Sequence, residues 1–541
     1  MLCGEVAYDA KAEARNRSDS LLGTDGEGPL RRQSDRRVTR LGTTLGGRQG
    51  RWIWTATGTY DRSGVEVRAD IPAASGRRNA ARSADRRFEA DLVLTGPVVD
   101  LPAGALSATI GGGIGARDFE SRSSLDDVDR DPVISRDRGI VRGSLDLPLL
   151  RRGKFSPFGT LSINANGAVE RLSDAGSLRT FGYGLNWSPV EAVSIIASAT
   201  NEQGAPTLEQ LGGPQLLTPN MRTFDFGRGE VVDVTRVSGG NRRLRADDRH
   251  VVRLGINVRP LAATDLTLSA DYVATRIDDP IAAFPIATPK IEAAFPDRFT
   301  RDAEGRLFRI DARPLNFAGS RQAQLRWGFN FTRPLGPVSP AMQNASVRVF
   351  ASEAEARRAH PGAIFSRAEP GSAMAQGAGN LTSRVFVSLY HNWYLKDAIT
   401  VREGSPALDL LSGDAVDVRG GTRRHEVAVQ AGVFKRGLGA RLTANWQGGS
   451  EIRGSNGAAG DLYFGDLATV NVTFFANLAE RFGGSGAPGW LKGARATLGI
   501  TNLFGTRPDV RDRVGATPLS YQPAYLDPLG RVINISLRKT M

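Results

Sequence analysis

The chain ends on the stretch GITNLFGTRPDVRDRVGATPLSYQPAYLDPLGRVINISLRKTM, residues 499–541. This stretch predicts a strand, a polar loop that contains four prolines, and a closing strand. In the closing strand the apolar residues occupy alternate positions, namely Ile533, Ile535 and Leu537. Because successive side chains of a strand point to opposite faces, this period of two predicts that one face meets an apolar medium and the other does not.

The same period of two recurs upstream, in strands whose connections alternate between short and long. Short connections are predicted at 96–104, 151–154, 188–192, 259–264 and 435–437. Long connections are predicted at 120–138, 202–247, 277–321, 396–421, 449–466 and 505–528. Transmembrane β-barrels have short periplasmic turns and long extracellular loops, whereas a soluble sandwich has no reason to alternate them.

We therefore predict an all-β fold, a transmembrane antiparallel β-barrel of roughly 18 strands with both chain ends on the periplasmic side. The barrel domain is expected to span residues 1–541. Segment 334–382 falls where a short turn belongs and includes a strand-like run at 346–351; we interpret the whole segment as a periplasmic insertion. A soluble or secreted β-rich binding protein is the alternative, and it would need apolar strand faces that pack against each other.

The composition agrees with a barrel and argues against a helical membrane protein and a nucleic-acid-binding protein. No run of about 18 apolar residues occurs, so a helical membrane span is excluded. The net charge of +13 could indicate a nucleic-acid partner, but the basic residues are mostly arginines spread along the chain among carboxylates. Because nucleic-acid binding needs clustered cations or a recognition motif, we expect none. Arginines of this kind suit a water-filled lumen or the lipid phosphates at a barrel rim.

Two short motifs near the C-terminus carry a resemblance to a known family. Asn502-Leu503-Phe504 precedes the last loop, and Asp527-Pro528-Leu529-Gly530-Arg531 precedes the closing strand. Upstream, segments 201–206, 223–230 and 237–241 add further matches in the same order. In these features the chain resembles the TonB-dependent receptors of the bacterial outer membrane. The resemblance implies a receptor that binds a scarce solute outside the cell, such as siderophore-iron, cobalamin or a saccharide, and imports it when TonB pulls on a plug domain.

The resemblance also implies parts that this sequence does not show. Complete relatives begin with a signal peptide, a TonB-contacting box and a plug domain, and they continue into barrels of about 22 strands. The start of this chain, MLCGEVAYDAKAEARNRSDS, has no basic region followed by an apolar one. We therefore expect an N-terminally truncated barrel portion without a plug, whose last strand has an unpaired edge. TonB is expected as a partner only if a plug is supplied upstream.

In relatives the C-terminal strand is the signal that the barrel assembly machinery recognises, and it ends on an aromatic residue. The residues at the matching positions here are Ile533, Ile535, Leu537 and Met541. Met541 stands where the family usually has Phe, so weaker recognition is expected. Outer-membrane lipid and this machinery are the macromolecular partners that the resemblance implies.

No arrangement of residues predicts catalysis, a cofactor or a metal. Asp127, Asp129 and Asp131 have the opening spacing of a calcium loop, but Pro132 replaces the required glycine, so a solvated loop is expected. The glycine-rich run at 111–116 lies inside an alternating strand, which favours glycines at a bend in the barrel wall over a dinucleotide site. The four histidines show no metal-ligand spacing, and His391 with Trp393 suggests an interfacial aromatic belt.

The long loops are the expected place for ligand contacts. Candidates in the loop 202–247 are Arg222, Phe224, Asp225 and Arg228, although a loop that packs on itself over the barrel mouth would use the same residues structurally. We interpret the protein as a non-enzymatic outer-membrane receptor or transporter for a small molecule or chelate. A passive porin-like channel is the alternative within the membrane class.

Overall fold

The computed structural model describes residues 3–21, 30–70, 78–125, 128–130, 133–153, 157–261, 264–335, 383–417, 420–435, 437–454, 460–478, 481, 488–491, 493–527 and 529–539. One large antiparallel sheet of 20 strands dominates it. Two of these strands are short additions in the loops, β6 (Val128–Arg130) and β21 (Leu408–Asp409), which leaves 18 long strands, as predicted.

The long strands follow one another in space as they do along the chain, each antiparallel to the next. They are β1 (Cys3–Leu21), β2 (Leu30–Gln49), β3 (Trp52–Asp70), β4 (Arg78–Leu101), β5 (Gly104–Leu125), β7 (Val133–Leu150), β8 (Thr160–Leu172), β9 (Gly176–Ser188), β10 (Val193–Gly204), β13 (Asp247–Val258), β14 (Asp265–Asp278), β19 (Gly319–Pro334), β20 (Arg384–Thr400), β22 (His425–Lys435), β23 (Leu438–Gln447), β26 (Leu467–Asn477), β27 (Ala494–Thr501) and β29 (Val532–Lys539).

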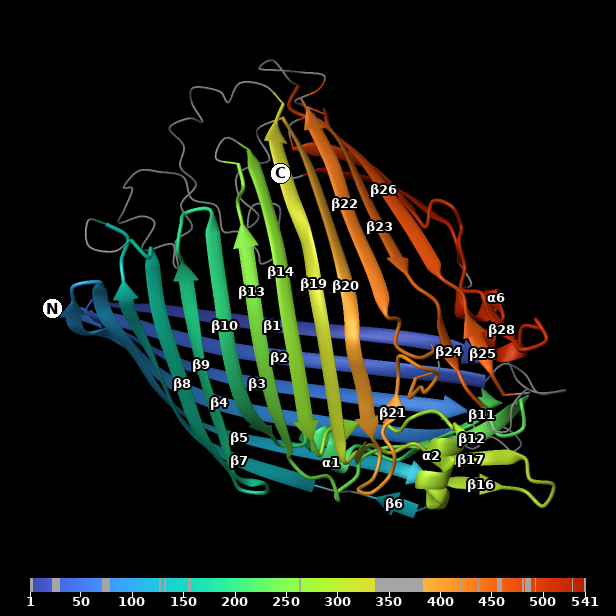
Figure 1. Cartoon of the computed structure of the whole chain (residues 1–541). Coiled ribbons are helices and arrows are strands. Elements are labelled where there is room, and N and C mark those ends of the chain that lie inside the picture. Colours follow the sequence, from blue (N-terminus) through green and yellow to red (C-terminus); the bar gives the residue numbers. More distant parts are fainter. Residues whose placement is uncertain are drawn as a thin grey trace.

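Figure 1 shows that this sheet curls into a barrel. The long strands from β8 to β26 form the wall nearest the viewer, and the long strands β1 to β5 cross behind them at a steep angle. Such a crossing follows from the twist and tilt that strands adopt when a sheet curls into a barrel. The long loops gather at the end of the barrel that lies at the lower right. The fold is therefore the predicted all-β barrel.

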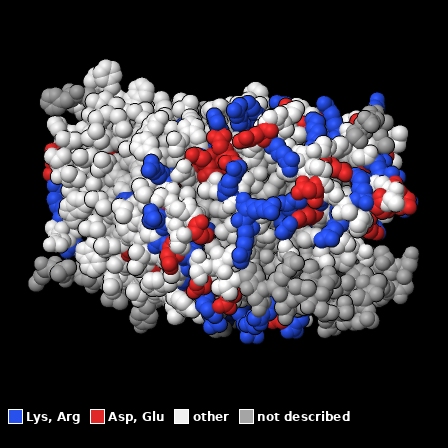
Figure 2. All heavy atoms as spheres, turned by 90° about the horizontal axis from the view of Figure 1, so that it is seen from below, with Lys and Arg blue, Asp and Glu red and all other residues white. Residues whose placement is uncertain are grey.

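One face of the sheet is apolar and open. Ile114, Val141, Val169 and Phe181 lie on this face in neighbouring strands, and each side chain is more than half exposed. A soluble protein would bury a continuous apolar surface of this size, whereas hydrocarbon chains cover it in a membrane. Charged side chains in the view from below gather toward the end with the long loops, and the other half is largely uncharged (Figure 2).

The connections match the predicted alternation with some corrections. The turn between β4 and β5 is only Pro102-Ala103, because β4 continues through Gly96 and Pro97 by means of a register shift between Pro97 and Val99. A bulge lets a strand accept proline, which cannot donate a ladder hydrogen bond. β5 and β7 likewise extend deep into the predicted loop 120–138.

The alternation has exceptions at both ends of the barrel. At the end with the short turns, β26 and β27 are joined by the long connection 478–493. β8 and β9 meet in a three-residue turn, 173–175, at the end where the long loops lie. Segment 334–382, interpreted as a periplasmic insertion, lies almost wholly outside the described residues, as does the strand-like run 346–351. Its flanks are in place, since β19 ends at Pro334 and β20 begins at Arg384.

The long loops contain small elements of their own. The strands are β11 (Leu216–Asp225), β12 (Glu230–Ser238), β15 (Ile281–Ala282), β16 (Phe299–Arg301), β17 (Leu307–Asp311), β18 (Leu315–Asn316), β24 (Ser450–Ile452), β25 (Leu462–Phe464) and β28 (Val510–Asp512). The helical turns are α1 (Leu208–Gly212), α2 (Pro289–Ala294), η1 (Pro296–Arg298), η4 (Leu519–Tyr521) and α6 (Pro523–Leu526). Of the helices described, none has the length and apolar character needed to cross a membrane.

Candidate solute-binding mouth of the barrel

The long loops fold together into a compact unit over one end of the barrel, which we call the loop cap. It consists of the described parts of 205–246, 279–318, 401–424, 448–466 and 502–531. The largest fully buried side chains of the described protein all lie in this cap, namely Leu208, Asp225, Phe226, Ile291, Leu307, Ile452, Leu462 and Val510. Among the described residues, the deepest burial is therefore at the barrel mouth, since the barrel wall itself exposes its apolar face.

Aromatic side chains from three loops meet in the cap. Phe224 lies 5.0 Å from Phe226 and 6.2 Å from Tyr521 between ring centroids, and Tyr521 lies 5.6 Å from Phe464. All three pairs meet edge to face, the arrangement that aromatic quadrupoles favour. Burial raises the pKa of Tyr521 well above its ordinary value, so its hydroxyl stays protonated. These rings fix the loops around 224, 464 and 521 to one another.

Arg301 links three segments of the cap through charge-assisted hydrogen bonds. Its guanidinium donates to both carboxylate oxygens of Asp225 at 2.7 and 3.1 Å and to both of Glu292 at 2.7 Å. It also donates to the carbonyl of Gly305 at 2.8 Å. The hydrogen bonds that Arg301 donates to Glu292 and Asp225 raise the pKa of Arg301, so the group stays charged. Bidentate pairs of this geometry position loops accurately.

The structure separates the four predicted ligand contacts into two pairs. Phe224 and Asp225 lie inside the cap core, with Asp225 completely buried. Arg222 and Arg228 lie on the cap surface, where Arg222 contacts Asp233 at 3.2 Å and Arg228 contacts Glu230 at 2.6 Å. Ligand binding by these four residues stays a prediction.

Sequence reasoning missed Arg301 and Glu292. Neither residue belongs to a recognisable motif, and they lie 76 and 67 positions from Asp225 in the chain. One signal was available, because the segment FPIATPKIEAAFPDRF at 284–299 is too rich in phenylalanine for an unpacked loop. Its Phe284, Phe295 and Phe299 pack against each other in the cap.

The luminal face of the wall is lined by ion pairs that cross the glycine-rich strand β5. Arg142 of β7 contacts Asp91 of β4 at 3.1 Å, and a Cβ added to Gly113 between them would lie 2.5 Å from the Asp91 carboxylate. Arg138 bonds to Glu170 and lies 3.5 Å from Glu89 on the same face. The glycines of the run 111–116 that face the lumen therefore leave room for side chains of β4 and β7 to meet above β5.

Polar contacts continue around the lumen on later strands. Arg253 donates to Asp271 at 2.9 Å, and the guanidinium of Arg326 lies 4.5 Å from the centroid of the Tyr390 ring. Arg441 donates to Gln430 at 3.1 Å. The lumen is therefore lined by polar and charged groups along these strands, whereas the outer face of the wall is apolar.

The barrel wall brings together two histidines that are far apart in sequence. His391 of β20 and His425 of β22 stack with ring nitrogens 3.1 Å apart, and Trp327 and Trp393 lie against them. Such rings suit the interface between hydrocarbon and headgroups. Within the described parts of the chain, no group of three or more His, Cys, Asp or Glu could hold a metal ion. Asp127 and Asp131 of the calcium-like spacing lie outside those parts.

The closing strand β29 presents the predicted apolar row. Ile533, Ile535 and Leu537 are strongly exposed, at 62%, 81% and 73% of their surface. They share the apolar face of the wall through the pairing of Ile535 with Leu498 of β27. Met541 lies outside the described residues. A role of this row in assembly stays a prediction.

Solved structures of outer-membrane proteins share this fold, a barrel with loops folded over one end. A siderophore receptor, PirA from Acinetobacter baumannii, superposes with a TM-score of 0.57 at 11% sequence identity, covering 99% of this chain and 71% of that one. The outer-membrane transporter YddB from Escherichia coli gives a TM-score of 0.58 at 9% identity, covering 98% of this chain and 66% of that one. The RagAB peptide transporter gives 0.51 at 10% identity, over 92% and 62% of the two chains.

These similarities establish the fold that the resemblance implied. Comparison of the sequence with protein families and with curated proteins finds no match. The chain thus shares the three-dimensional architecture of these outer-membrane proteins while its sequence differs from theirs at about nine positions in ten.

Proposed function

We propose that this chain is a bacterial outer-membrane receptor barrel of the TonB-dependent family, which takes up a scarce small solute or chelate. The observation that carries the proposal is the loop cap, a packed unit set over a barrel with a charged lumen. A barrel that only anchored itself in the membrane would need neither. The shared fold with a siderophore receptor and two transporters supports the same class.

The solute classes to test follow from this proposal. They are ferric siderophores, cobalamin and saccharides, with peptides added because one transporter of this fold carries them. Arg222 and Arg228 are the residues of the predicted set that a solute can reach on the cap surface. Phe224 and Asp225 would act by holding the cap in shape. Lipid and the barrel assembly machinery are the proposed partners of the wall, and TonB would act through a plug domain.

Solute binding can be tested by titrating the purified chain in detergent with each class and following tryptophan fluorescence. We expect saturable binding of one class, weakened several-fold in Arg222→Gln or Arg228→Gln. Arg511→Gln, which removes another exposed arginine of the cap that is paired with Asp509 and not with the tested residues, is the matched control. Absence of saturable binding for every class would contradict the receptor function.

The ion-paired lumen supports a passive porin-like channel as a second candidate. Arg138, Arg142 and Arg253 with their carboxylate partners would let small ions pass through water. Planar-bilayer recordings with each solute class separate the two functions, because the unitary conductance of a passive channel does not change when a solute is added. The conductance of a receptor barrel falls as its solute occupies the mouth, over the same concentrations that saturate binding.

A further inference from the structure

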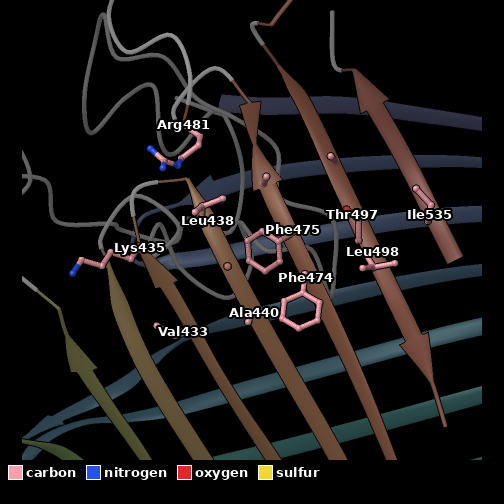
Figure 3. Close-up of a pocket in the computed structure, with 13 residues that line it drawn as sticks. Val433, Lys435, Leu438, Ala440, Phe474, Phe475, Arg481, Thr497, Leu498 and Ile535 are labelled. Atoms are coloured by element: carbon pink, nitrogen blue, oxygen red, sulfur yellow. The ribbon is translucent and has the colours of Figure 1, made fainter. Parts of the chain in front are cut away.

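An apolar groove of about 700 Å³ crosses the last five strands of the barrel on their apolar face (Figure 3). Two neighbouring cross-strand rows form it. The first row is Val433, Ala440, Phe474, Leu498 and Ile535, and the second is Lys435, Leu438, Ala476 and Ala496. The volume lies in the range of about 300–1,000 Å³ that is typical of ligand sites.

The shape of the groove follows from the side chains of these rows. Ala476 pairs with Ala496 in the second row, beside the much longer Phe474 and Leu498 in the first. Because the alanines are short, the surface sinks between the longer side chains. The groove therefore suits a slender, flexible apolar group better than a rigid one.

The two cations of the groove lie at one end of it. Lys435 is the last residue of β22, and Arg481 belongs to the connection between β26 and β27. Figure 3 shows both near the strand ends, while Phe474 and Leu498 lie farther along the wall. Among the described residues that line the groove, none is acidic. An occupant with a negative head and an apolar tail would complement this charge.

We propose that the groove binds an anionic phospholipid of the periplasmic leaflet. One acyl chain would lie along Ala440, Ala476 and Ala496, and the phosphate would lie between Lys435 and Arg481. The short β22–β23 turn at this end belongs on the periplasmic side, which places the two cations at headgroup depth. The inference rests on the outer-membrane placement proposed above. Such a lipid would also brace the junction of β27 with β29, since Leu498 and Ile535 meet across it.

Native mass spectrometry of the full chain in detergent, with added phosphatidylglycerol or phosphatidylcholine, tests this site. We expect the chain to retain phosphatidylglycerol preferentially. Lys435→Gln and Arg481→Gln should each lower that retention roughly fivefold, whereas Lys396→Gln, a cation toward the opposite end of the wall, should not. Ala476→Phe should fill the groove and displace lipid, whereas Ala274→Phe on the outward face of β14 should not.

The outcomes separate this site from the proposed function. Equal retention of the two lipids by the folded, detergent-bound chain would overturn the lipid site alone, as would unchanged retention in Ala476→Phe. A chain recovered as a soluble monomer without detergent would overturn the membrane placement and the lipid site together. Circular dichroism of each variant confirms that its β-structure is retained.

Discussion

Asp225 is a charged side chain that has no contact with solvent, although it belongs to a loop. A buried carboxylate is costly unless charged hydrogen bonds replace its water. Arg301 supplies two of these bonds, and the amide of Gly227 donates a third at 2.9 Å. Burial of the Asp225 carboxylate is therefore stable only when all of these partners are present. Together they hold the loop in one conformation.

Asp225→Asn should destabilise the loop cap by about 3 kcal/mol, because it removes one charge of a buried pair and leaves the other. The barrel wall should hardly change, since it does not contribute to this pair. Hydrogen exchange of segments 222–232 and 292–306 measures the local free energy of opening. Asp233→Asn, in an exposed pair, should change it by less than about 1 kcal/mol. Equal effects of the two substitutions would contradict the assigned role of Arg301.

Asp311 makes the cap sensitive to acid. Burial alone would raise the pKa of Asp311, but hydrogen bonds from Arg313 and the charges of Arg298 and Arg313 lower it below its ordinary value. The unfolded carboxyl titrates near pH ~3.9, so the stabilisation is complete above that pH and disappears as pH falls through the lower folded pKa.

The cap around 298–313 should accordingly lose protection below about pH 4. Protection factors, corrected for the intrinsic exchange rate at pH 6 and pH 3, measure this loss. Asp311→Asn has no carboxyl to titrate there and should lose less protection over the same interval. An identical acid response in both proteins would show that another group governs it.

At the scale of the elements, strand β5 shows how a glycine run serves a barrel wall. Gly112 faces outward, where an added Cβ would lie in ordinary contact, 3.7 Å from the carbonyl of Ile140. Gly113 faces the lumen beneath the Asp91–Arg142 pair. The Asp91–Arg142 ion pair therefore requires a glycine at position 113. It places no such requirement on Gly112, which faces outward.

Gly113→Val should be less stable than Gly112→Val by about 1–3 kcal/mol, because the luminal side chain displaces Asp91 and strains the wall. Thermal unfolding in detergent, followed by circular dichroism, compares the two variants directly. Both gain the same strand propensity, so their difference isolates the luminal contact. A Gly112→Val variant that is the less stable of the two would reverse the assigned faces.

The strands could be predicted from the sequence because apolar side chains recur at every second residue of each strand. Loops such as 202–247 and 277–321 were located to within a few residues for the same reason, since alternation stops where they begin. The extension of β4 past Pro97 was missed because the bulge there interrupts the alternation of apolar and polar residues. From the sequence, a loop packed on itself over the barrel mouth could be considered, but the contacts that build the cap were missed, because pairs such as Asp225 with Arg301 join distant segments that follow no period.

At the scale of the whole molecule, the 18 long strands determine how the wall can close. Among the described residues β1 pairs with β2 and β29 with β27, and no pairing joins β1 to β29. An even number of antiparallel strands sets these two edges antiparallel to each other. Lipid cannot satisfy the backbone groups of a free strand edge. From the sequence, the last strand was expected to have an unpaired edge, but because of this cost we expect β1 and β29 to pair when the chain is in a membrane.

Closure can be measured by electrophoresis in dodecyl sulfate with and without heating. A closed barrel resists the detergent and migrates faster before heating than after it, because its backbone hydrogen bonds leave no edge. We expect this shift for the chain refolded into phospholipid vesicles. Equal migration of heated and unheated samples would indicate an open sheet.

The proposed function requires an outer-membrane barrel with the loop cap outside the cell and the short turns in the periplasm. The most direct test is the labelling of single cysteines by a membrane-impermeant maleimide, in cells that export a Cys3→Ser chain. Glu304→Cys, on the cap surface, should be labelled in intact cells. Arg51→Cys, in the turn between β2 and β3, should be labelled only after lysis. Labelling of Arg51→Cys but not Glu304→Cys in intact cells, or recovery of the chain in the soluble fraction, would contradict the account.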